Sequence, residues 1–124
     1  MKKITLVSRI LLSLMLIVFG LNTFLQFMPM PAMAEPAQQF MGALVQTGYL
    51  MVIVAIIEIF AGILILINRS SAVALVVLLP VLINAFLFHL FLDIPGIGAS
   101  VLALLLTVYL IYVEKDKFIP LLKA

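Results

Sequence analysis

The strongest constraint on this chain is a series of four apolar stretches, each close to the length needed to cross a lipid bilayer. They cover residues 10–28, 46–67, 72–92 and 97–113. A hydrocarbon core of about 30 Å requires roughly 20 apolar helical residues, and without water every backbone N–H and C=O must bond within its own segment. The sequence therefore predicts an all-α integral membrane bundle of four transmembrane helices, forming a single transmembrane domain over residues 1–124.

The scarcity of charge supports this prediction. Of 124 residues, 67% are hydrophobic, and only seven Lys or Arg and five Asp or Glu are present. A soluble domain has about a quarter of its residues charged, so the outer surface of this protein is expected to meet the lipid bilayer. The basic residues form no run that could follow a phosphate backbone, and no nucleic-acid partner is expected. The chain has no Cys and one His, which excludes thiol chemistry and argues against a resident metal.

The positions of Lys and Arg predict the orientation of the helices. All seven precede the first stretch, lie between the second and third, or follow the fourth: Lys2, Lys3, Arg9, Arg69, Lys115, Lys117 and Lys123. The other two connections contain neither residue. Because basic loops stay in the cytoplasm, both termini are predicted to be cytoplasmic and segment 29–45 extracytoplasmic. The expected location is the bacterial inner (plasma) membrane, which the chain crosses several times.

An alternative interpretation is that the first stretch is a cleaved secretory signal. Lys2 and Lys3 precede an apolar run, and Ala32, Met33 and Ala34 imitate an Ala-x-Ala cleavage site. Cleavage would leave three spans. The apolar run is longer than a typical signal core and ends far from Ala34, so we favour retention as a transmembrane helix.

The extracytoplasmic segment 29–45 is rich in Met and Pro. Phe40, Met41 and Leu44 recur at helical spacing, which predicts a short interfacial helix that acts as a lid over the bundle mouth. Its methionines also raise the possibility of Cu(I) binding, but thioethers without neighbouring Cys or His make a weak site. We interpret these methionines as apolar filling. The methionines concerned are Met28, Met30, Met33 and Met41.

Glu58 is the most unusual residue within a predicted span. An ionisable side chain is costly in hydrocarbon, and Glu58 has small neighbours at helical spacing in Ala55, Ala61 and Gly62, so we expect it to face the bundle. Arg9 is the expected partner, although Glu58 stands about 13 Å from the cytoplasmic end of its helix, so Arg9 must reach inward or water must enter. Two interpretations stay open: a buried ion pair that fixes helix register, and a site that handles protons or a ligand.

Three further polar residues lie toward the extracytoplasmic half and are expected to share a cavity: Asn22, Asn84 and His89. For Asn84 we favour a structural role, because it follows Pro80 by four residues and its amide can bond a carbonyl freed by that proline. His89 near the outer interface fits either a structural hydrogen bond or a proton relay. Together with Arg9 and Glu58, these are the candidate ligand or polar-core residues, and no catalytic residue is assigned.

Several short motifs resemble the DoxX family of small bacterial four-helix membrane proteins. They are Arg9-Ile10-Leu11-Leu12, Phe19-Gly20-Leu21-Asn22, Ile57-Glu58-Ile59 with Ala61-Gly62, and Phe88-His89-Leu90-Phe91. The resemblance covers nearly the whole chain and implies that Arg9, Asn22, Glu58, Gly62, Asn84 and His89 are family positions. Most members have no assigned activity, while some are linked to quinone or thiol redox complexes. The lack of cysteine departs from any thiol-redox pattern.

Three functional hypotheses follow. The first is a non-catalytic accessory or assembly partner, because no nucleophile, metal cluster or cofactor motif is evident; the chain is then not an enzyme on its own and needs no cofactor. The second is a membrane subunit of a quinone-linked, thiosulfate- or thiol-dependent oxidoreductase, with quinone as its cofactor and a soluble or membrane redox protein as its partner. The third, a small-solute or proton transporter, is less favoured because no internal repeat is evident and four spans require a homo-oligomer to alternate access.

Overall fold

The computed structural model describes residues 2–27 and 33–122, and these residues are almost entirely helical. In chain order the elements are α1 (Lys2–Leu25), α2 (Glu35–Gln46), α3 (Leu50–Leu66), α4 (Ser71–Leu92), the short 3₁₀ helix η1 (Ile94–Gly96), α5 (Ile97–Val113) and α6 (Lys115–Leu122). The described part contains no strand. The prediction of an all-α protein is therefore confirmed.

Several helices have the length and composition of membrane spans. Three segments qualify by themselves: Lys2–Leu25, Ser71–Leu92 and Ile94–Val113. A fourth qualifies if α2 and α3 are counted as one span, but these two helices meet at a bend of 88°. On its own α3 has 17 residues, at the lower limit for crossing a bilayer. The described part of the chain thus contains three to four helices compatible with a membrane bundle.

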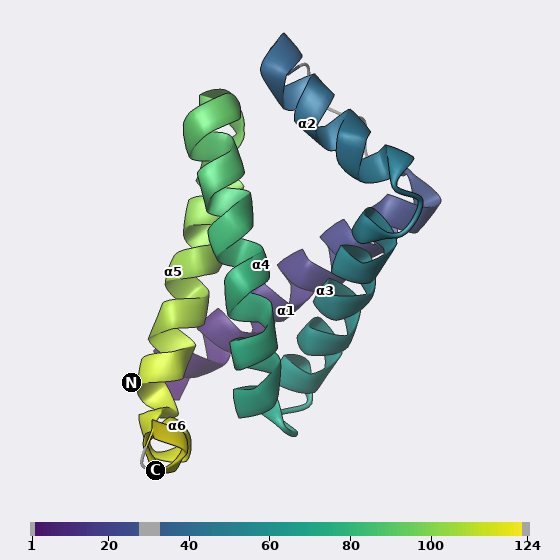
Figure 1. Ribbon diagram of the computed structural model, residues 1–124. Helices are drawn as coiled ribbons and strands as arrows, with labels where there is room; N and C mark the ends of the chain where they lie inside the picture. The colour runs from purple at the N-terminus through teal and green to yellow at the C-terminus, as the bar shows by residue number, and fades with distance from the viewer. Residues whose placement is uncertain (1, 28–32, 123–124) are drawn as a thin grey trace.

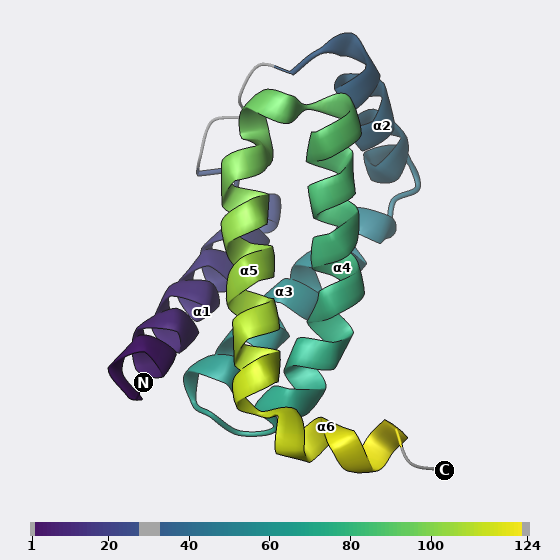
Figure 2. The ribbon, with the colours of Figure 1, turned by 90° about the vertical axis from the view of Figure 1, so that its left-hand side faces the viewer.

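The four long helices form a ring in which α1 packs against α3, α3 against α4, α4 against α5 and α5 against α1. Figures 1 and 2 show α4 and α5 as an upright pair, which α1 and α3 cross obliquely. The buried core is small and comes from all four: Leu12, Leu16, Ala61, Ile65, Ala74, Leu75, Leu78, Leu82, Ala103 and Leu110. Large apolar side chains also cover the outside, as with Phe60, Phe91 and Leu105, which are 62%, 75% and 61% exposed. Such a surface matches lipid rather than water.

The closest helix packing joins α1 and α3 and depends on glycine. A Cβ atom added to Gly62 would lie 2.9 Å from Ile17 Cγ1 and 3.1 Å from the Ser13 carbonyl oxygen. At Gly20 it would lie 2.6 Å from Ile59 Cγ1. Lipid supplies no hydrophobic force between helices, so small residues that let backbones approach stabilise the pair by van der Waals contact.

The helix boundaries differ from the predicted stretches at three places. α1 begins at Lys2 and not near residue 10, because the basic and hydroxyl residues before the apolar run are compatible with a helix. The segment predicted as loop 29–45 contains α2, so the helix expected around Phe40 is present. α3 begins at Leu50, after a bend at Gly48 (φ +79°), where Leu50 N donates to Thr47 Oγ1 over 3.1 Å. Met28, Met30 and Ala32 lie outside the described residues.

The described basic residues gather at one end of the bundle. Figure 1 shows the start of α1, the α3–α4 turn and α6 at the lower end, with α2 and the α4–α5 turn at the upper end. The lower elements carry Lys2, Lys3, Arg9, Arg69, Lys115 and Lys117. The upper elements carry Glu35 and Asp93.

Candidate functional site

Glu58 is the middle residue of α3, eight residues from Leu50 and eight from Leu66, and its side chain is half-buried. The contacts of Gly20 and Gly62 place the middle of α3 level with about residue 19 of α1. Arg9 is therefore about ten residues, or about 15 Å, away along α1. Neither of the two ion pairs in the described part of the chain includes Glu58 or Arg9. The predicted Arg9–Glu58 pair is not formed.

Asn84 does not face the interior of the bundle. The buried side of α4 is formed by Ser71, Ala74, Leu75, Leu78 and Leu82. At 100° per residue, Asn84 is rotated about 200° from Leu82 and is exposed on the outer face. Its side chain forms no hydrogen bond within residues 2–27 and 33–122, so the predicted bond to a carbonyl freed by Pro80 is absent. Asn84 is thus on the exposed side of α4, away from the buried core of the bundle.

Asn22 lies near the outer end of α1, where its side chain is half-buried. Its backbone carbonyl accepts a hydrogen bond from Gln26 N over 2.9 Å, and Gln26 then leaves the helix with φ at 51°. Asn22 therefore stands where α1 ends, within one turn of the last helical residue, Leu25.

His89 forms a polar pair with Asp93 at the C-terminal end of α4. Its Nδ1 lies 3.2 Å from Asp93 Oδ2 and 3.3 Å from the Asp93 carbonyl oxygen. Both oxygens can accept a hydrogen bond, so Nδ1 is placed to donate to Asp93 and Nε2 is left on the opposite side of the ring. Asp93 is buried, with 6% of its surface exposed. This arrangement can orient an imidazole for proton exchange at the edge of the bundle.

Neighbouring residues enclose this pair. A Cβ atom at Gly96 would lie 2.7 Å from Asp93 Oδ2 and 2.9 Å from His89 Cε1, so the η1 turn approaches the pair closely because residue 96 is glycine. Phe88 meets the His89 ring edge-on at 5.0 Å, and Phe40 of α2 stacks on Phe88 at 5.3 Å. α2 is thereby joined to the outer end of α4.

Asp93 is the residue that the sequence reasoning missed. It lies in the connection between stretches 72–92 and 97–113, yet it follows His89 by four residues, the spacing at which helical side chains meet. A second missed polar contact lies at the opposite end, where Ser71 Oγ donates to Glu114 Oε1 over 2.7 Å. These two residues are 43 positions apart, so no local spacing could have indicated their contact.

The structure places the sequence-predicted candidates in separate parts of the fold. Arg9 is near the start of α1, Glu58 is in the middle of α3, Asn84 is on the outside of α4, and His89 is beside Asp93. Within the described residues no three His, Cys, Asp or Glu side chains come together as a metal-binding group. No family model matches the chain, and neither the curated proteins nor the solved structures contain a match.

Proposed function

We propose that this chain is a DoxX-like protein that crosses the bacterial inner membrane four times, with both termini in the cytoplasm. The gathering of the described basic residues at one end of the bundle supports this orientation, because basic segments resist translocation. The resemblance to DoxX proteins rests on the motifs around Arg9, Asn22, Glu58 and His89.

Within that membrane the protein acts as a non-catalytic accessory or assembly partner of another membrane protein. The observation that carries this proposal is the exposed amide of Asn84. It is the one polar side chain on an exposed stripe of α4 that otherwise consists of Val73, Val77, Pro80, Leu87 and Phe91. An amide in hydrocarbon is costly, and a hydrogen bond to a neighbouring transmembrane helix offsets that cost. α4 is therefore the surface that meets the partner.

Site-specific photo-crosslinking tests this role. A photoreactive residue at position 84 is compared with one at Leu105, which is also exposed and also lies eight residues from the α4–α5 turn. We expect position 84 to crosslink to a partner chain and position 105 to crosslink mainly to lipid. Asn84→Leu should weaken copurification of that partner about 3- to 30-fold, as loss of one interhelical hydrogen bond predicts.

Equal crosslinking at both positions would contradict the proposal. Crosslinks only between copies of this chain would identify a homo-oligomer and would also contradict it.

The His89–Asp93 pair favours a second candidate function, a membrane subunit of a quinone-linked oxidoreductase. The imidazole that Asp93 orients can hydrogen-bond to a quinone oxygen and pass it one of the protons that quinone reduction requires, while a thiosulfate- or thiol-oxidising partner supplies the electrons. Decylubiquinone serves as the probe. Binding to the purified protein that weakens about tenfold in His89→Phe would support this function, whereas no binding, together with unchanged thiosulfate-dependent quinone reduction in membranes, would exclude it.

A further inference from the structure

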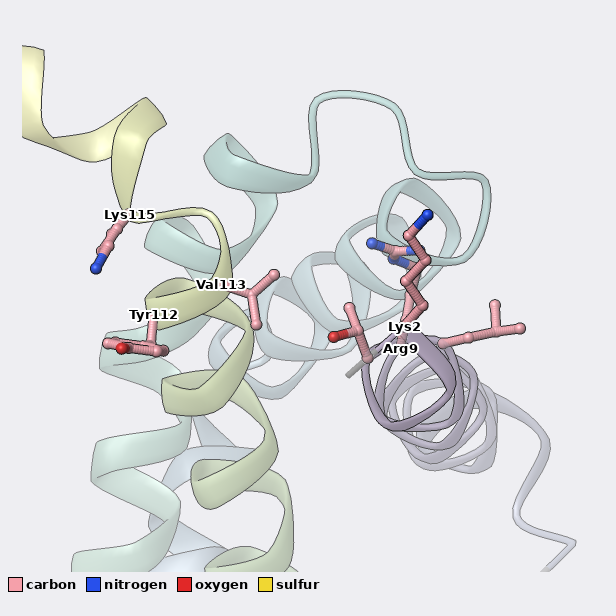
Figure 3. Close-up of a pocket in the computed structure, with 7 residues that line it drawn as sticks. Lys2, Arg9, Tyr112, Val113 and Lys115 are labelled. Carbon is pink, nitrogen blue, oxygen red and sulfur yellow. The ribbon is translucent and has the colours of Figure 1, made fainter.

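A groove of about 600 Å³ opens where the start of α1 faces the junction of α5 and α6. One wall comes from α1 and carries Lys2 and Arg9, while the other carries Lys115. Figure 3 shows the side chains of Lys2 and Arg9 pointing to the same side of α1. Beside the groove, Thr5 Oγ1 and the Tyr109 hydroxyl oxygen lie 3.0 Å apart and join α1 to α5.

The groove is positively charged and has no acidic residue in its lining. Lys2 and Arg9 are seven residues apart, which places them on one helix face about 10 Å from each other. Neither takes part in an ion pair within the described residues. Two acids adjoin Lys115 in sequence, and neither lines the groove. Glu114 accepts from Ser71 Oγ at 2.7 Å and pairs with Lys117 at 3.4 Å. Asp116 is exposed on α6 and forms no ion pair within the described residues. The positive charge of the groove is therefore available to an anion.

The same groove also has an apolar part that is open to the surroundings. Leu6 and Val113 line it and are 51% and 38% exposed. Tyr112 stands at the edge, with its ring 4.8 Å from Lys115 Nζ. A tyrosine and basic side chains at the end of a long apolar helix mark the depth of lipid headgroups, with hydrocarbon directly beside them. Cationic and apolar surfaces thus meet here in the order in which a phospholipid presents its phosphate and its acyl chains.

We propose that this groove binds an anionic phospholipid, with its phosphate at Lys2 and Arg9 and an acyl chain along Leu6 and Val113. Basic pockets between transmembrane helices are a recurring means of binding such headgroups. The failure of Arg9 to pair with Glu58 fits this assignment, because Arg9 lines the groove instead. The inference rests on the proposed placement in the membrane and is independent of the proposed partner of α4.

Native mass spectrometry of the purified full-length protein in a neutral detergent tests the site. Dioleoyl phosphatidylglycerol is the anionic probe, and dioleoyl phosphatidylcholine is the matched zwitterionic lipid. We expect tighter binding of phosphatidylglycerol, and about a fivefold loss of its affinity in Lys2→Gln and in Arg9→Gln, as expected for one basic residue at a headgroup. Arg69→Gln removes the same charge at the α3–α4 turn, outside the groove lining, and should change the affinity less than twofold.

Arg9→Lys keeps the charge and should retain binding, which separates loss of the site from loss of the fold. Equal binding of the two lipids would overturn the proposal, and so would an equal loss in Arg69→Gln. Inorganic phosphate distinguishes the two sources of the anion: if millimolar phosphate displaces the lipid completely, the groove takes a free anion and the lipid assignment is wrong. Any of these failures would leave the Asn84 crosslinking result unaffected.

Discussion

The position of His89 depends on neighbours in α4, at its C-cap and in η1, and indirectly on α2. Asp93 fixes Nδ1, Gly96 lets the following turn close on the pair, and Phe88 contacts the ring edge. Phe40 then stacks on Phe88 from α2. One titratable side chain is thereby held by α4, η1 and, through Phe88, by α2, so its removal affects more than a single hydrogen bond.

Substitution of His89 by Ala should lower the free energy of unfolding by about 1–3 kcal/mol, because the buried carboxylate of Asp93 loses its side-chain partner. Unfolding of the purified protein in mixed detergent micelles measures this change. The control is the double variant with Asp93→Asn, which should be less destabilised than the two single changes added together. Additivity within about 0.5 kcal/mol would show that the two side chains are not coupled.

At the scale of helices, the packing of α1 against α3 determines how far apart Arg9 and Glu58 lie. The Gly20 and Gly62 contacts set the register of the two helices and separate Arg9 from Glu58 along the helix axis. Hydropathy located the four long helices, and segment 97–113 coincides with α5, but it placed the start of α1 eight residues too late. It could not predict which residue of α1 faces which residue of α3, because side-chain packing determines that relation. Packing also determines the direction of Asn84. Because Leu78 and Leu82 are on the buried side of α4, Asn84 is on the exposed side.

Gly62→Ala tests this register directly. The new Cβ atom would meet the Ser13 carbonyl oxygen at 3.1 Å and Leu16 Cβ at 3.2 Å, and neither is the end of a flexible side chain. We expect a loss of about 1–3 kcal/mol in the free energy of unfolding, as for overpacking elsewhere. Gly98→Ala is the matched control in α5, where the added Cβ atom meets nothing within 4 Å. It should raise stability by about 0.5–1 kcal/mol, since alanine restricts the unfolded chain. Equal effects of the two substitutions would contradict the close packing of α1 and α3.

At the scale of the whole molecule, the bend between α2 and α3 determines how the protein sits in a bilayer. α3 alone is about 25 Å long, slightly shorter than a hydrocarbon core of about 30 Å. α2 carries exposed Glu35, Gln38, Gln39 and Gln46 and turns away from α3 by 88°. Such a polar helix suits the membrane surface and not the hydrocarbon. The four-span arrangement that we propose therefore has α3 crossing the bilayer by itself, with α2 at the membrane surface.

This arrangement predicts that two introduced cysteines are accessible from opposite sides of the membrane. The chain has no cysteine of its own, so only the introduced one can react. Gln39→Cys in α2 should react with a membrane-impermeant maleimide in intact spheroplasts, while Asp116→Cys in α6 should react only after the membrane is opened. Both side chains are exposed, so burial does not prevent either reaction. Labelling of Asp116→Cys before the membrane is opened would contradict the proposed orientation and indicate the opposite one.

Accessibility alone does not distinguish four spans from three, because cleavage after Ala34 would leave both positions on their predicted sides. The mass of the labelled chain makes that distinction. A full-length chain retains α1, and with it the Gly20 and Gly62 contacts and the groove at Lys2 and Arg9. A labelled chain that begins at Glu35 would eliminate both features together, since each requires α1 to remain in the folded protein.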